Sequence, residues 1–584
     1  MADTPERGAD TPERGTDTPE RGTGMPERGA GFWAHRGLIA VATGTALAEA
    51  GLLLVVAPAA RALAPQATAL PPLAVFHDLR WLDRAPPSWP LFVLLLAGVL
   101  LARSAVNAVL VRLAWPAGSA PPAPLAAWRH ALGFTAFACL LLSPLASLTL
   151  GLAVLPFSWP FLATMAVMLL IAVPLSHGGV TSSWWRMLPP PVAVGWLLAD
   201  VAVLSAAAAA IGGLPAAVAL AVTALAGLVN ARAWYGLTAA VAPRAQRQLA
   251  PAGRWLAGPA RIPAVPAAIL AALTVVTLAI RLAFWANAPV PQAAQAHAGS
   301  AAAGVTAASL AAPRGRWRHA PVLTVPGFGA HCCAGPGCCG YGWPLARAMP
   351  GVLVQSFSYR GLDRAGNPLP YGVTAGDLPL PVLGNRIAAQ VWWLYDRTGR
   401  RVDVVAESEG SLGVYAMLAQ HPDVPVAAVV LLSPIVAPGQ LGYPVGGPSL
   451  LPGSELQAVE WLVGGLSPFG TAGAQRLIGS VSRVGARFAA AAARRSRLPW
   501  LELVPLADAV TLPACRLPAN VLVVPALHGE LLGDPVAMGI VREFLTHHRV
   551  SGTRSLRTTA EFVAAAASAW RLPQAAAPSP PCPR

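Results

Sequence analysis

Three residues in the second half of the chain have the types that nucleophilic catalysis needs. Ser408 follows the apolar run VDVVA, Asp508 follows LELVPL, and His528 follows VLVVPAL. A serine hydroxyl becomes a strong nucleophile when a histidine takes its proton, and a carboxylate must orient that histidine. The three residues therefore predict attack on an acyl carbonyl, with Ser408 as nucleophile, His528 as base and Asp508 as the orienting acid.

The residues around Ser408 predict a sharp turn between a strand and a helix. Ala406 and Gly410 stand two positions before and two positions after it in AESEG, and small residues there let the chain turn without clashes. The backbone N–H that follows the nucleophile, here that of Glu409, helps to bind the developing oxyanion. A second N–H is expected from an early loop, where VPGFG makes Phe328 the candidate; a plain strand-to-loop turn is the alternative.

Rivals exist for the acid and for the base. Asp534 follows His528 too closely, and Glu530 shares its loop, which leaves Asp508 as the favoured acid. The other histidines of this half lack a position at the end of a predicted strand: His319, His331, His547 and His548.

These segments resemble the α/β-hydrolase superfamily, and in particular its lipases and esterases. The likeness covers the chain from residue 316 and consists of AESEG, of the acid turn ADAVTLP and of the histidine in HGELLGDP, in the order nucleophile, acid, histidine. The chain departs from the family pattern at Ala406, where glycine is commoner, at Glu407, where His or Tyr is usual, and at Pro326, which replaces the histidine of the H-G-F loop.

The resemblance implies a Ser-His-Asp triad of Ser408, His528 and Asp508, with an oxyanion hole made by the N–H groups of Phe328 and Glu409. It also implies that the segment 434–499, which departs from the strand-helix rhythm, forms a cap over the nucleophile. The apolar content of this segment favours an acyl chain as substrate. No metal or other cofactor is expected.

The second half of the chain is expected to fold as an α/β domain over residues 316–571. Short apolar runs alternate there with amphipathic patterns, which is typical of a mainly parallel sheet flanked by helices. The predicted strands are 322–325, 352–359, 402–406, 427–433, 501–506 and 521–527, and the predicted helices are 386–399, 411–421 and 534–548.

The first half predicts a helical membrane domain over residues 37–286. The whole chain is 55% hydrophobic and only 11% charged, with a mean hydropathy of +0.54, whereas soluble proteins carry about 25% charged residues. About 20 apolar residues cross a bilayer. Seven segments qualify: 37–60, 90–113, 131–154, 160–176, 191–212, 214–235 and 264–286; the third and fourth could instead form one re-entrant hairpin. We expect disordered tails at 1–36 and 572–584 and a flexible linker at 287–315.

Arginine placement predicts the orientation of these spans. The chain has no lysine, so arginine carries its whole positive charge, and short cytoplasmic loops hold an excess of such residues. With a cytoplasmic N-terminus, the inner segments hold Arg7, Arg14, Arg21, Arg28, Arg36, Arg112, Arg129, Arg186, Arg232, Arg244, Arg247, Arg254 and Arg261, against Arg61, Arg80 and Arg84 outside. The C-terminal domain is then expected outside the cytoplasm, in a multi-pass protein of the cell membrane.

Four ionisable residues fall within the predicted spans: Glu49, Arg103, Asp200 and Arg281. Such residues are costly in a bilayer and are candidates for function. Glu49 or Asp200 could neutralise Arg103 between helices, Arg281 could reach an interface, and the acids could instead line a polar cavity.

The loop HCCAGPGCCGYGW concentrates four cysteines, Cys332, Cys333, Cys338 and Cys339. Adjacent cysteines do not match the spacing of zinc ligands, and an oxidising setting outside the cytoplasm favours disulfides. We expect two bridges across the Gly-Pro-Gly turn, without a defined connectivity.

The function expected from the sequence is a membrane-anchored serine hydrolase that cleaves an acyl ester. An acyltransferase with the same triad is the nearest alternative, and a transporter or sensor with a non-catalytic domain is another. The net charge of +15 does not indicate nucleic-acid binding, because the arginines are scattered among spans and loops. The high Ala, Gly, Pro and Arg content indicates a GC-rich coding bias of the actinobacterial kind. The expected partners are the membrane and a lipid or other acyl-ester substrate.

Overall fold

The structure is a computed structural model, and the residues that it describes fall into two parts of the sequence, which meet where α18 (Arg557–Ala567) packs on α7 (Pro191–Ile211) and Trp570 donates to Ser205 Oγ at 2.8 Å. The first is the helical half, residues 30–248, and the second is the α/β half, residues 319–570. The described residues are 30–56, 58–82, 89–117, 120–151, 190–211, 214–248, 319–332, 343–434, 480, 484–493, 498–512, 517–550, 555–567 and 570. The expected tails and the expected linker lie outside these ranges, apart from the end of the N-terminal tail.

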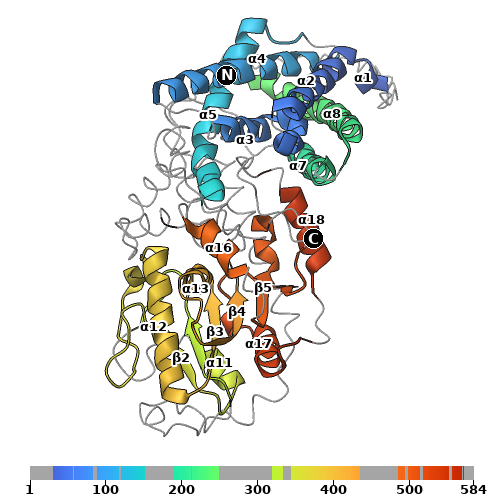
Figure 1. The fold of residues 1–584 in the computed structure, drawn as a ribbon. Coiled ribbons are helices and arrows are strands. Elements are labelled where there is room, and N and C mark those ends of the chain that lie inside the picture. Colours follow the sequence, from blue (N-terminus) through green and yellow to red (C-terminus); the bar gives the residue numbers. More distant parts are fainter. Residues whose placement is uncertain are drawn as a thin grey trace, which may run out of the picture.

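Four helices of the helical half are long and apolar enough to cross a membrane (Figure 1). They are α2 (Arg36–Val56), α4 (Trp89–Leu113), α7 (Pro191–Ile211) and α8 (Ala216–Gln248). Each coincides with a predicted span, and their lengths suit the hydrocarbon core of a bilayer. A further helix, α5 (Pro124–Gly151), covers most of the third predicted span. The predicted spans 160–176 and 264–286 lie outside the described residues, so the count of seven stays a prediction.

The segment between α2 and α4 is folded onto the bundle, although the sequence indicated only a loop there. It forms η1 (Pro58–Thr68) and the short helix α3 (Pro71–Leu82). Another short helix, α1 (Ala30–Trp33), comes before α2. Polar groups from the long helices bind its backbone: Trp234 donates to the Thr68 carbonyl at 2.9 Å, and Asp200 accepts from the Leu70 N–H at 2.9 Å. These bonds satisfy backbone groups at the junction between η1 and the 12-residue α3, which is too short to span a bilayer.

The α/β half contains a six-stranded sheet in which every neighbouring pair is parallel. The strands, in the order β2-β1-β3-β4-β5-β6, are β1 (Val322–Val325), β2 (Val354–Ser356), β3 (Val402–Glu407), β4 (Val426–Leu432), β5 (Trp500–Pro505) and β6 (Val521–Val524). All six fall on predicted strands, and the mainly parallel sheet is confirmed. Because both faces are covered, β4 is apolar throughout, and β3 is buried throughout and apolar apart from Asp403 and Glu407.

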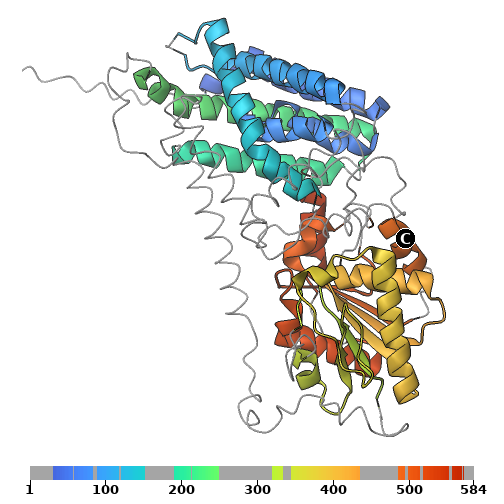
Figure 2. The same cartoon turned by 90° about the vertical axis from the view of Figure 1, so that its left-hand side faces the viewer.

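Helices cover both faces of the sheet (Figures 1 and 2). One core joins the sheet to α12 (Leu380–Thr398), α13 (Glu409–Gln420) and α16 (Ala486–Ala493), and a second joins it to α11 (Trp343–Ala348) and α17 (Pro535–His547). The three predicted helices correspond to α12, α13 and α17. A last helix, α18 (Arg557–Ala567), packs on β6 and on η8 (Leu506–Thr511). Two short turns, η4 (Val373–Gly376) and η9 (Leu531–Gly533), precede α12 and α17.

Candidate active site

Ser408 stands at the apex of a turn between β3 and α13. Its backbone has φ 51° and ψ −117°, a left-handed conformation that is uncommon for a residue with a side chain. Ala406 before it is fully buried in the sheet. The strained turn lifts the hydroxyl to the carboxyl edge of the sheet, as the AESEG pattern predicted.

Gly410 is required where α13 passes the end of β1. A Cβ at this position would lie 2.8 Å from the Val325 carbonyl oxygen and 2.9 Å from the Pro326 carbonyl oxygen. Carbon and oxygen atoms that are not bonded do not approach so closely, so only glycine allows the helix to start here.

We expect Gly410→Ala to distort this turn. The added methyl group must displace backbone carbonyls of β1, and overpacking of this kind costs about 1–3 kcal/mol of folding free energy. Thermal unfolding of the full chain in detergent would register the loss. Gly539→Ala on α17 is the matched control, because a Cβ there meets nothing within 4 Å; equal melting temperatures for the two variants would contradict the account.

The structure brings Ser408, His528 and Asp508 into one hydrogen-bonded chain. The distance from Ser408 Oγ to His528 Nε2 is 2.8 Å, and the distance from His528 Nδ1 to Asp508 Oδ2 is also 2.8 Å. Asp508 lies in η8 after β5, and His528 lies in the loop after β6. Because β3, β5 and β6 are parallel members of one sheet, their carboxyl ends lie on the same edge, and the three side chains meet there.

The environment favours a basic His528. Burial lowers the pKa of its imidazole, but the charge and the hydrogen bond of Asp508, and then the charge of Glu407, raise it, and the net shift is above the usual 6.5. A basic Nε2 beside a serine hydroxyl can accept the hydroxyl proton during attack on a carbonyl. Asp508 is 5% exposed, so its carboxylate acts in a site that is largely shielded from water.

The loop after β1 lies directly against the serine. A Cβ built on Gly327 would be 3.1 Å from Ser408 Cβ and 3.7 Å from Ser408 Oγ. This loop contains Phe328, whose side chain is 45% exposed. The sequence-based candidates for the two oxyanion donors, the N–H groups of Phe328 and Glu409, thus belong to segments that flank Ser408 on two sides.

Tyr359 supports this loop, and sequence reasoning missed it. Its hydroxyl donates to the Pro326 carbonyl at 2.9 Å, and its ring is fully buried between Phe357 and Tyr371, with edge-on ring contacts of 5.1 and 5.2 Å. The predicted strand 352–359 ends at this tyrosine, but its partner lies 33 positions away in the sequence. Burial of the ring could be inferred from the strand pattern, whereas the hydrogen bond could not.

The cysteine loop lies mostly outside the described residues. Cys332 is buried and pairs through its backbone with Tyr371 in an antiparallel bridge. Cys333, Cys338 and Cys339 are not described, so the two expected disulfides stay a prediction. Most of the expected cap, 434–499, is likewise outside, although α16 within it packs against α13.

The helical half contains a second polar cluster. Arg103 donates to both carboxylate oxygens of Asp78 at 2.6 Å, and His77 lies 3.0 Å from Asp78 Oδ1 and 2.7 Å from Glu49 Oε1. The sequence had suggested Glu49 or Asp200 as the acid that neutralises Arg103. The structure supplies Asp78 instead, because α3 folds onto the bundle beside α4. Arg281 lies outside the described residues.

Arg103→Ala is expected to destabilise the helical half. It would leave Asp78 ionised and buried without its bidentate partner, a change that typically costs about 3–5 kcal/mol. The melting temperature of the full chain in detergent measures the effect. Arg112, in the last turn of α4, is half-buried and donates to the Pro122 carbonyl instead of a carboxylate, so it offers a control of the same residue type. An Arg103→Ala protein as stable as Arg112→Ala would contradict this role.

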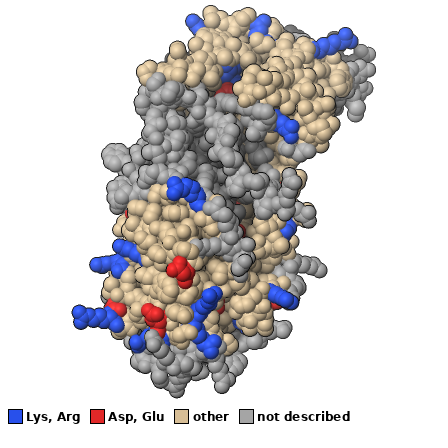
Figure 3. Space-filling view, viewed as in Figure 1, with Lys and Arg blue, Asp and Glu red and all other residues tan. Residues whose placement is uncertain are grey.

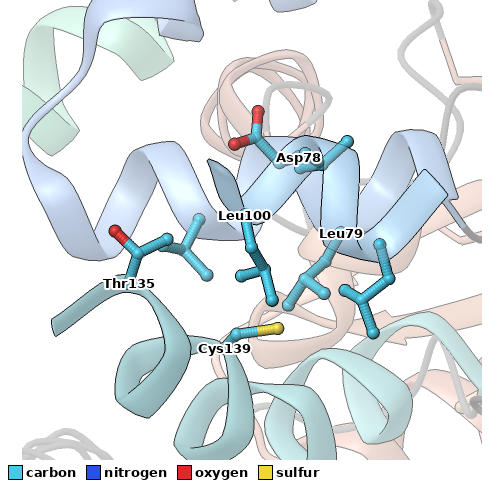
Figure 4. Close-up of a pocket in the computed structure, with 8 residues that line it drawn as sticks. Asp78, Leu79, Leu100, Thr135 and Cys139 are labelled. Atoms are coloured by element: carbon cyan, nitrogen blue, oxygen red, sulfur yellow. The ribbon is translucent and has the colours of Figure 1, made fainter. Parts of the chain in front are cut away.

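Three further observations limit what the described residues can bind. A cavity of about 10 Å³ beside Asp78 has room for little more than one water, and the Asp78 carboxylate points away from Leu79, Leu100 and Cys139 of its lining (Figure 4). Within the described residues, no group of three or more His, Cys, Asp or Glu side chains is arranged to hold a metal ion. On the face in Figure 3 the arginines are spread over the surface and do not form one large patch.

Comparisons of the chain with protein-family models, with curated proteins and with solved structures found no match. The geometry of the site is therefore the basis for a functional assignment.

Proposed function

We propose that this protein is a membrane-anchored serine hydrolase that cleaves acyl esters. Ser408 Oγ attacks the ester carbonyl while His528 Nε2 takes its proton, and the N–H groups of Phe328 and Glu409 bind the oxyanion. The imidazolium then gives its proton to the departing alcohol. Water, deprotonated by His528, attacks the acyl-serine, and the acid product leaves as the serine regains its proton.

A single observation carries the proposal, the continuous chain from Asp508 through His528 to Ser408, with both bonds at 2.8 Å. The left-handed backbone at Ser408 supports it, because an ordinary loop serine has no need of such strain. The loop that contains Gly327 lies close to Ser408, which supports an oxyanion hole beside the serine hydroxyl. The order Ser408, Asp508, His528 along the chain agrees with the α/β-hydrolase resemblance.

The four apolar helices and the arginine pattern support a location in the cell membrane, with a cytoplasmic N-terminus and the α/β half outside. An enzyme held there meets lipids and other envelope esters rather than cytoplasmic metabolites. We therefore propose an acyl chain of a lipid or a similarly apolar ester as the substrate class.

A panel of esters tests the function. The full chain, purified in detergent, is expected to hydrolyse p-nitrophenyl esters, with a preference for longer acyl chains over acetate. Product analysis in the presence of added alcohol separates release of the free acid from transfer of the acyl group, which is the acyltransferase alternative. Absence of turnover on every ester, with water or alcohol as acceptor, would reject the proposal.

A further inference from the structure

The side chain of Glu409 is buried next in sequence to the nucleophile and has no role in the mechanism above. The loop after β1, residues 326–328, is the proposed oxyanion loop. It is 3% exposed, and neither carboxylate oxygen has a hydrogen-bond partner among the described residues. Only its backbone N–H belongs to the proposed oxyanion hole. A buried carboxyl group without partners is costly, so its presence next to the nucleophile requires an explanation.

The surroundings of Glu409 contain acids and phenols. A Cβ built on Gly376 would lie 3.2 Å from Glu409 Oε2 and 3.5 Å from Tyr359 Cζ, so the carboxyl group and the phenol ring both pack against Gly376. The titratable groups that act on it or respond to it are Tyr359 and Tyr371, which follow β2, and Asp377 after η4. Arg386 of α12 donates to the Tyr359 carbonyl.

This environment accepts a neutral carboxyl group and not a charged one. Burial, and then the charge of Asp377, raise the pKa of Glu409 well above its usual value. A buried carboxyl group without hydrogen-bond partners is favoured in its uncharged form, and the side chain therefore fills its site as a neutral group beside Tyr359 and Gly376. An ionised Glu409 would face the charge of Asp377 with no hydrogen-bond partner in its present position, and it would have to leave this site.

We propose that the neutral Glu409 side chain is a positioning residue for the oxyanion loop, and that its ionisation at alkaline pH releases the loop and slows the reaction. The path runs through one bond: Glu409 packs beside Tyr359, and the Tyr359 hydroxyl holds the Pro326 carbonyl at 2.9 Å. Pro326 precedes the residues that contact Ser408. This inference rests on the proposed function, because it concerns the rate of attack by Ser408.

The test is the pH profile of the full chain between about pH 6 and pH 10, measured as the rate of Ser408 modification by a fluorophosphonate and as ester turnover. Each variant is compared with its own rate near neutrality. The wild type is expected to lose rate on the alkaline side by about tenfold per pH unit beyond the midpoint. Glu409→Gln, which cannot ionise, is expected to lack this loss.

Two more variants make the test specific. Asp377→Asn removes the negative charge that opposes ionisation of Glu409, so the alkaline loss should move to lower pH. Glu502→Gln is the matched control: burial also raises the pKa of Glu502, but it lies on β5 and bonds to Trp500, so its profile should follow the wild type. Tyr359→Phe lacks the bond to Pro326, so its rate of Ser408 modification should be low at every pH. That rate should fall little further on the alkaline side.

The results separate two failures. A wild type that is not modified at any pH would reject the hydrolase proposal itself. A wild type that is modified at Ser408, with an alkaline loss that persists unchanged in both Glu409→Gln and Asp377→Asn, would overturn the role of Glu409 and leave the hydrolase proposal standing. A wild type without any alkaline loss up to about pH 10 would overturn it as well.

Discussion

Replacing Ser408 with alanine is expected to lower ester hydrolysis by about 10⁶-fold, to the level left by binding and oxyanion stabilisation alone. The substitution removes the atom that forms the acyl-enzyme, and among the described residues no other hydroxyl is hydrogen-bonded to His528. The fold should tolerate it, because alanine keeps the Cβ that the turn already accommodates. Turnover of a long-chain p-nitrophenyl ester by the full chain measures the effect.

Two controls define the result. His528→Ala should be nearly as slow, since the serine hydroxyl then has no base, and combining both substitutions should add little, because residues that act as a unit are not additive. Thr546→Ala on α17 also removes a hydroxyl, but an exposed one that donates to a helix carbonyl, and it should not change turnover. Substantial activity in Ser408→Ala would reject the assignment.

Asp508→Asn is expected to lower turnover by about 10⁴-fold while the fold is kept. The amide can still occupy the site, but it no longer fixes the imidazole tautomer that presents a free Nε2 to Ser408. The pH profile adds an independent sign. Because neutral His528 is the active form and Asp508 raises the pKa of His528, activity in the wild type falls as the pH drops through that raised pKa. Without the carboxylate, the acid limb should move to lower pH.

A second aspartate serves as the comparison. Asp363 lies in an exposed turn, where it accepts hydrogen bonds from Asn367, and Asp363→Asn should keep both the rate and the acid limb of the wild type. If Asp508→Asn kept the acid limb at the same pH, the carboxylate would not be coupled to His528, and the geometry would have to be explained differently.

The sheet could be predicted because its strands are short apolar runs that leave little ambiguity. β3 and β4 are rich in valine and are buried on both faces, so β4 is a continuous apolar run and β3 is interrupted only by Asp403 before its final Glu407. The strand predictions also placed the candidate catalytic residues, because Ser408, Asp508 and His528 each come after a strand. Parallel order then places these strand ends together without any knowledge of side-chain contacts.

The remaining features depend on contacts between distant segments. Asp78 escaped notice as the partner of Arg103 because α3 is a 12-residue helix with neither the length of a span nor a clear polar face. The role of Tyr359 depends on a carbonyl 33 positions away in the sequence. The burial of Glu409 depends on the approach of Gly376 in η4 to its carboxyl group. Sequence patterns give periodicity within one element, and they carry little information about which elements meet.

The central claim is that Ser408 is the nucleophile of an acyl-ester hydrolase, and covalent labelling tests it most directly. The full chain is treated with a fluorophosphonate, digested, and the modified peptide is identified by mass spectrometry. The account predicts a single adduct on Ser408, in the peptide that carries AESEG, which disappears in Ser408→Ala and in His528→Ala. An adduct on another residue, or labelling that persists in Ser408→Ala, would contradict it.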